Sequence, residues 1–226
     1  MTDDLSDALQ SWPGDPFSQS VRELQAADGR PLIQVRLDLG ILQMERSGRP
    51  DGTAVHGHHT ALAAWDAGDC GEHGELLLRA EFGQFHTRGR ALMILGHHQE
   101  AAQDGEHLVN IAARLANTPS THSHSLMPAA ITFRAHAGAE AAISDSRTDL
   151  ARIALESGLR ELQQVLNTEE FQRSPEAALL RSMIEAFTPR LPSSQRAELE
   201  ARLQDAISQE NYELAAILRN ELRMMR

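Results

Sequence analysis

Hydrophobic side chains recur every three or four residues through the middle of this chain. The spacing predicts amphipathic helices over residues 75–95, 99–115, 127–144 and 149–166. Gly96 would end the first of these helices, and the breaker 117–120 would end the second. A further helix is expected over 176–187, where Pro175 fits the first turn and Ser174 fits the N-cap. The periodicity therefore predicts an all-α body.

The first third of the chain is less regular. Residues 1–16 are polar and end in the breaker Trp12-Pro13-Gly14-Asp15-Pro16, so a flexible arm is expected there. Val21 and Leu24 would begin a short helix that stops at Asp28-Gly29, and a second short helix is expected over 56–65. The helical body would then span residues 17–190.

Residues 31–46 fit two patterns. Strand-like alternation is carried by Ile33, Val35, Leu37 and Leu39, whereas a helical stripe is carried by Leu32, Val35, Leu39 and Leu42. A strand would need a partner, and the segment offers one only as a hairpin back through Ile41 and Met44. Helix is therefore the favoured interpretation, and strand is the alternative.

The last segment, residues 193–226, has the pattern of a two-helix hairpin. Its first helix carries one apolar stripe, formed by Leu199, Leu203, Ala206 and Ile207. The second helix, over 212–224, has two apolar sides: Tyr212, Ala215, Ala216 and Leu222 can face the first helix, whereas Leu214, Ile217, Leu218 and Met225 lie on the other. A two-helix hairpin cannot bury both sides alone, so one side must dock on the body, a second copy or another protein.

The hairpin resembles the UVR motif of the repair proteins UvrB and UvrC in the pattern Leu199-x3-Leu203-x2-Ala206-x4-Asn211-Tyr212-Glu213-x-Ala215-Ala216-x-Leu218-Arg219-Asn220-x-Leu222. Asn211 and Asn220 stand where acidic residues are usual in that family. UVR motifs join UvrB to UvrC, and they occur in regulators of Clp-type proteases and in arginine-kinase activators. The resemblance therefore implies protein–protein contact, carried by Leu199, Leu203, Ala206, Tyr212, Glu213, Ala215, Ala216, Leu218, Arg219 and Leu222.

Two further resemblances cover other parts of the chain. Residues 85–108 resemble one tetratricopeptide unit, in which a Gly turn separates two helices that cross at small residues. An irregular antiparallel helix bundle is the alternative architecture for this body. Residues 35–52 are similar to a group of planctomycete-type bacterial proteins that end in a UVR motif.

Charge and composition exclude several classes of protein. The net charge of −11 argues against a nucleic-acid-binding surface, because phosphate contacts need clustered cations. The chain has no lysine, so a P-loop and Schiff-base catalysis both lack their essential side chain. The acidic N-terminus is not a signal peptide, and no apolar run approaches the ~20 residues of a membrane span. A cytoplasmic protein is expected.

Candidate catalytic and metal-binding side chains are scattered. Histidines cluster at 56–59, 97–98 and 122–124, but a metal site needs several imidazoles that converge on one ion. Cys70 is the only cysteine, and its acidic neighbours Asp69 and Glu72 oppose a reactive thiolate. No catalytic residue, metal site or cofactor is expected from these patterns.

The leading hypothesis from the sequence is a non-enzymatic adaptor that binds another protein, or a second copy, through the hairpin at 193–226. One alternative is an accessory factor of nucleotide-excision repair that contacts DNA or UvrB/UvrC-type proteins. Another alternative is a His-rich metal-binding protein. The acidic charge counts against direct nucleic-acid contact, and the metal-binding protein is the less favoured of the two alternatives.

Overall fold

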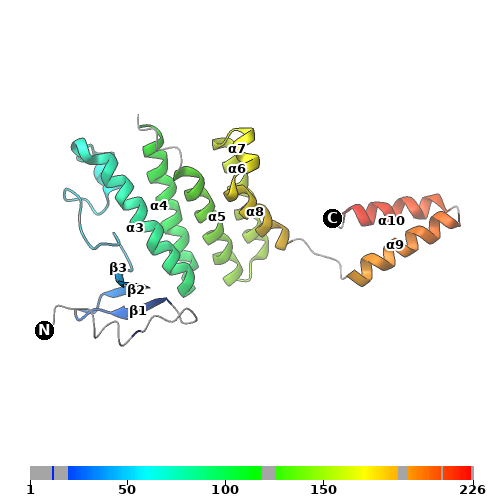
Figure 1. The fold of residues 1–226 in the computed structure, drawn as a ribbon, viewed down its shortest axis with the longest axis horizontal. Coiled ribbons are helices and arrows are strands. Elements are labelled where there is room, and N and C mark those ends of the chain that lie inside the picture. The colour runs from blue at the N-terminus through cyan, green and yellow to red at the C-terminus, as the bar shows by residue number, and fades with distance from the viewer. Residues whose placement is uncertain (1–11, 13–19, 119–125, 188–192, 210, 225–226) are drawn as a thin grey trace. The chain divides into compact units, whose positions relative to one another are not determined.

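A computed structural model of the chain describes residue 12 and residues 20–118, 126–187, 193–209 and 211–224. Apart from Trp12, the arm expected over 1–16 lies outside the described residues. The chain divides into two compact units, Met1–Arg181 and Ser182–Arg226, and each is described by itself. Most of the described residues are helical, so the mostly helical fold is confirmed (Figure 1).

The first unit opens with a small antiparallel sheet in the order β1-β2-β3, formed by Val21–Gln25, Pro31–Leu37 and Gly40–Glu45. The helices predicted over 21–28 and 31–46 are therefore wrong, and the strand alternative for 31–46 holds. The β2–β3 hairpin that the sequence offered does form, with Ile33 opposite Met44. The sequence pattern did not indicate β1, which pairs with the other edge of β2 and places Val21 opposite Val35.

The helices predicted over 75–95, 99–115, 127–144, 149–166 and 176–187 form with closely similar bounds, whereas the one expected over 56–65 begins only at Ala61, and two short helices, over 71–73 and 168–173, were not expected. The helices of the body are α2 (Ala61–Ala67), the short 3-10 helix η1 (Gly71–His73), α3 (Gly74–Leu95), α4 (His98–Ala116), α5 (Leu126–Ser144), α6 (Thr148–Val165), α7 (Thr168–Arg173) and α8 (Pro175–Ala186). Gly96 ends α3 in the left-handed conformation at φ 81°, which favours glycine. The Ser174 hydroxyl accepts a hydrogen bond from the Ala177 amide at 3.1 Å, as expected of an N-cap.

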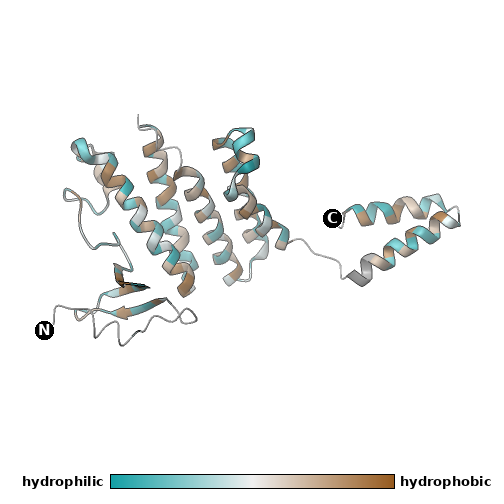
Figure 2. Cartoon of the chain, in the orientation of Figure 1, coloured by the Kyte–Doolittle hydropathy of each residue, from teal (hydrophilic) through white to brown (hydrophobic). Residues whose placement is uncertain are grey.

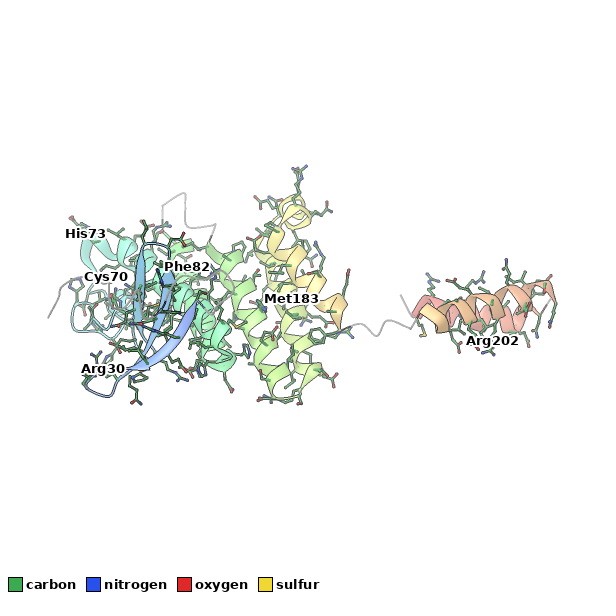
Figure 3. All side chains as sticks on the ribbon, turned by 60° about the horizontal axis from the view of Figure 1, so that its bottom comes forward. Arg30, Cys70, His73, Phe82, Met183 and Arg202 are labelled. Atoms are coloured by element: carbon green, nitrogen blue, oxygen red, sulfur yellow. The ribbon has the colours of Figure 1, made fainter. Side chains whose placement is uncertain are left out.

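One face of the sheet packs on the C-terminal half of α3. Val21, Ile33 and Met44 are buried there against Ala91 and Leu92. In Figure 1 the sheet lies below the helices of the first unit, and in Figure 3 it comes forward. The three strands share one buried face. The alternating apolar side chains of each strand are therefore buried only when the strands are assembled into the sheet.

Neighbouring helices of the body meet at glycines. A side-chain carbon on Gly105 of α4 would lie 2.7 Å from the backbone Cα of Arg134 in α5. A side-chain carbon on Gly158 of α6 would lie 2.5 Å from the Cβ of Ala135 in α5. A real Cβ atom does not come this close to another heavy atom. Both helix pairs therefore depend on glycine for their close approach.

A buried ion pair joins α3, α4 and the loop after the sheet. The Arg88 guanidinium donates to both Asp104 oxygens, at 2.9 and 2.6 Å, and also to the Gly48 carbonyl at 2.6 Å. Both side chains are almost fully buried. Burial raises the pKa of the Asp104 carboxyl, although the Arg88 guanidinium acts in the opposite direction. The pair therefore fixes the geometry of three segments at a desolvation cost that offsets much of its attraction.

A second buried carboxylate, Glu81 of α3, organises the N-terminus of α2. Glu81 is fully buried and accepts hydrogen bonds from the amides of Ala61 and Leu62 at 2.5 and 3.1 Å. The His107 Nε2 lies 3.0 Å from one of its oxygens, and the Arg49 Nε lies 3.2 Å from the other. Burial raises the pKa of Glu81, but the hydrogen bonds from His107 and the two amides outweigh it, so the pKa lies below its ordinary value.

This lowered pKa predicts an acid-sensitive first unit. The contribution of Glu81 to stability is complete above its ordinary pKa of 4.5, and it is lost as the pH falls through the lower pKa of the folded state. We expect the free energy of unfolding of Glu81→Gln to fall less steeply below pH 4.5 than that of the unmodified chain. Urea titrations followed by circular dichroism at several pH values would measure this. Identical acid dependence in both chains would contradict the role of Glu81.

Candidate protein-docking hairpin

The second unit is built around a two-helix hairpin, α9 (Ser193–Ser208) and α10 (Tyr212–Met224), as predicted. Its core is small. Ala206 of α9 and Ala215 and Leu218 of α10 are buried, with Leu199 and Leu203 packed against them. The two alanines allow the helices to approach closely, and the leucines fill the space on either side.

Asn211 closes the hairpin. Its side-chain Oδ1 accepts a hydrogen bond from the Leu214 amide at 3.2 Å, as an N-cap does for α10. Its own amide donates to the Ala206 carbonyl at 2.9 Å, which satisfies an acceptor at the end of α9. Asparagine caps a helix about as well as aspartate, so the departure from the usual acidic residue preserves the local structure.

The ten residues implied as protein-binding fall into two groups. Five of them lie together in the hairpin core: Leu199, Leu203, Ala206, Ala215 and Leu218. The other five lie outside the core. Leu222 is half-buried, and the exposed residues are Tyr212, Glu213, Ala216 and Arg219. The placement of Leu218 on the outer side was wrong, since only 2% of it is exposed, and the placement of Tyr212 and Ala216 toward the first helix was wrong, since both are exposed. Ala215, Leu218 and Leu222 follow one another at i, i+3 and i+7, which is the stripe that faces α9.

The outer surface of the hairpin keeps a second set of apolar side chains. On α10 the exposed positions Leu214, Ile217 and Met224 share one side, and Ile217 is 57% exposed. Tyr212 is 69% exposed on the opposite side of the same helix, and Ile207 of α9 is half-exposed. Figure 2 shows brown, hydrophobic positions interrupting the hydrophilic surface of α10. The hairpin therefore leaves more large apolar side chains outside its core than inside it.

Cys70 and the histidine clusters lie in the first unit. The Cys70 thiol is buried and donates to the Ala61 carbonyl at 3.6 Å, and burial raises its pKa, as do the charges of Asp69 and Glu81. Among the histidines at 56–59, His58 pairs with Asp69, Nε2 to Oδ2, at 2.7 Å. Within the described ranges, no three His, Cys, Asp or Glu side chains are placed to hold one metal ion. The cluster at 122–124 lies outside those ranges.

The loop after the sheet lines an open pocket of about 410 Å³ whose cations already have partners. Arg30 pairs with Asp28 and Glu45. Arg49 pairs with Asp51 and Glu81. Because each guanidinium faces two carboxylates, the pocket offers no net positive charge to an anionic ligand.

Comparison with known proteins identifies one segment of the chain. Residues 193–226 match the family described as UvrB/uvrC motif. No curated protein and no solved structure matches the chain. The tetratricopeptide-like and planctomycete-type resemblances of the first unit therefore stay predictions. No helix in the described part of the chain is long and apolar enough to cross a membrane. The C-terminal hairpin of α9 and α10 is a UVR motif.

Proposed function

We propose that this chain is a non-enzymatic adaptor whose UVR hairpin captures a partner protein. The observation that carries the proposal is the outer apolar surface of α10. Leu214, Ile217 and Met224 share one exposed side, although the hairpin already has a core of its own. Exposed aliphatic side chains grouped on one side of a helix favour helix-in-groove or helix-on-helix binding.

The proposed contact has an apolar centre and a charged rim. Ile217 lies near the middle of α10, between Leu214 and Met224, and would be the side chain most fully desolvated by a partner. Glu213 is exposed one turn before Ile217, at the rim of this side of α10. Arg219 is exposed on the side of Tyr212, so it would reach only a partner that also covers that side. Both side chains would set the register by pairing with charges of the partner, which adds more to specificity than to affinity.

The UVR match favours a partner that carries a helical hairpin of the same kind. UVR motifs join UvrB to UvrC, so such proteins are the first candidates, together with a second copy of this hairpin. Direct contact with DNA is a separate hypothesis, which the net charge of −11 disfavours. DNA binding would have to weaken steeply with salt, because phosphate contacts release counterions.

Ile217→Glu tests the proposal in the full-length chain. Purified UvrB and UvrC from the source organism serve as binding partners, and calorimetry measures the affinity. We expect Ile217→Glu to weaken binding by about tenfold or more, because it places a charge at the centre of the contact. The hairpin core should remain folded because Ile217 lies outside it.

Gln204→Glu is the matched control, since it adds the same charge at an exposed polar position of α9, outside the proposed contact on α10. It should bind as the unmodified chain does. Equal affinity of Ile217→Glu and the unmodified chain would contradict the proposed contact surface. Absence of binding to every UVR protein tested, including this hairpin itself, would contradict the adaptor function.

A further inference from the structure

The sheet of the first unit ends in an open edge at β3. Leu37 and Gly40 close the β2–β3 hairpin around a two-residue turn, so the backbone groups of Ile41 and Gln43 point away from β2. The Glu45 amide follows the same alternation two residues further on. It points away from β2 and donates to the Pro50 carbonyl at 2.8 Å. Among the described residues, no backbone partner is found for the outward groups of Ile41 and Gln43.

The two edges of the sheet differ in how they are protected. The β1 edge carries Arg22 and Glu23, and Arg22 lies over the Trp12 ring at 4.3 Å. The β3 edge carries no charged side chain before Glu45. Instead, the hairpin exposes leucines: Leu39 at its tip is 97% exposed, and Leu42 on β3 is 37% exposed. An uncharged edge with exposed aliphatic side chains is a template for pairing with another strand.

An apolar groove runs beside this edge, between β3 and α3. Its volume is about 440 Å³, and its lining is mainly apolar, from Leu42, Met44, Pro50, Ala80 and Gly83, with Gln43, Asp51, Gln84 and Thr87 as the polar members. The Thr87 hydroxyl already donates to the Gly83 carbonyl at 2.8 Å, so it does not need a polar ligand. A strand added at β3 would direct every second side chain into this groove.

The outer flank of α3 continues the same surface. Leu76, Ala80, Gly83, Thr87 and Ile94 fall on one side of the helix, and the two large side chains are more than half exposed. Large apolar residues thus stand at both ends, and small residues lie in the middle. A side-chain carbon on Gly83 would meet no atom within 4 Å, so there is room for another helix to approach.

We propose that this surface binds a second copy of the same chain. A two-fold axis beside Leu42 would pair Ile41 of each copy with Gln43 of the other, which joins the two sheets into one six-stranded sheet. The α3 helices would then cross antiparallel beside the axis. In that arrangement Leu76 of one copy faces Ile94 of the other, and Gly83 lies near Thr87 of the second copy.

Self-complementarity favours a second copy over an unrelated peptide. An isologous contact requires each element to match itself after a two-fold rotation. The outward backbone groups of Ile41 and Gln43 lie symmetrically about Leu42, and the α3 flank has a small centre and large ends, so each element matches itself after the rotation. An extended peptide would occupy the strand edge alone and leave Leu76 and Ile94 in water.

Sedimentation equilibrium of the full-length chain tests this dimer with two substitutions. Gly83→Arg places a long cation in the groove, and Gln43→Pro removes an outward amide that β2 does not use. The unmodified chain is expected to sediment at twice the monomer mass. Each substitution should weaken the dimer by about tenfold or more, since like charges would meet across the axis or a central hydrogen bond would be lost. Circular dichroism should show that both variants stay folded.

Hydrogen exchange identifies the contact directly. In the dimer the amides of Ile41 and Gln43 should be protected, and in Gly83→Arg they should exchange as exposed amides do. Gln99→Arg adds the same charge at an exposed position of α4, and Ile217→Glu alters the hairpin; both should leave this dimer intact. A chain that is monomeric at all concentrations, or a dimer that survives both β3 and α3 substitutions, would overturn the proposal. Loss of the dimer in Ile217→Glu alone would assign it to the hairpin instead.

Discussion

Replacing Asp104 with alanine is expected to lower the free energy of unfolding of the first unit by about 3–5 kcal/mol. The substitution leaves the Arg88 guanidinium buried, with the Gly48 carbonyl at 2.6 Å but without its carboxylate. An uncompensated charge in this position has lost its water and gained no counter-charge, which costs far more than the net contribution of the intact pair. Denaturation in urea, which is uncharged, would measure the loss when it is followed by circular dichroism.

The double variant Arg88→Met with Asp104→Leu separates the two effects. It removes both charges and fills the space with apolar side chains, so it should cost less than Asp104→Ala alone. Some loss should remain, because Arg88 also holds the Gly48 carbonyl of the loop after the sheet. If the double variant proved less stable than Asp104→Ala, the pair itself would be the main source of stability, contrary to this account.

Gly105→Ala is expected to destabilise the first unit by about 1–3 kcal/mol through overpacking. The added carbon would lie 2.7 Å from the Cα of Arg134, and a backbone atom in the middle of α5 cannot move away as a flexible side chain can. The helix pair α4–α5 would have to separate, which also opens its contacts at Leu108 and Ala130 in the same core. The midpoint of urea unfolding reports this change.

Gly138→Ala is the matched control because it makes the same substitution inside α5, at a position with room for the added carbon. That carbon would meet only the Cβ of Ala154, at 3.8 Å, which is ordinary van der Waals contact, so the lower backbone entropy of alanine in the unfolded chain should raise stability by up to about 1 kcal/mol. The two substitutions therefore have opposite expected signs. A loss of stability in both variants would mean that helix crossing is not what makes Gly105 necessary.

The helices could be predicted because each carries its own periodicity. The spacing of Phe82, Phe85 and Leu92 already describes a buried side of α3, and Gly96 marks its end. The sheet could not be predicted in the same way. Val21 and Leu24 are too few to show alternation, and the strand-like pattern of 31–46 could not be separated from a helical stripe without β1 as a further partner strand.

The hairpin was predictable as a pair of helices, but the phase of α10 was not. Ala216 and Ala215 are equally suitable for a close approach, and only the structure shows that Ala215 faces α9. The buried ion pair of Arg88 and Asp104 was also invisible in the sequence. Arginine and aspartate side chains usually face water. The burial of this pair depends on how α3 and α4 pack, which the sequence does not show.

The small core of the UVR hairpin would couple its stability to the binding proposed above. Three buried side chains and two leucines beside them are little to hold two helices together, whereas Ile217, Tyr212 and Met224 stay in water. A partner that covers those side chains adds its binding energy to the stability of the hairpin. Free chain should therefore be cut by proteases within 193–226 far faster than bound chain, so that in a cell the supply of partner would set how long the hairpin survives.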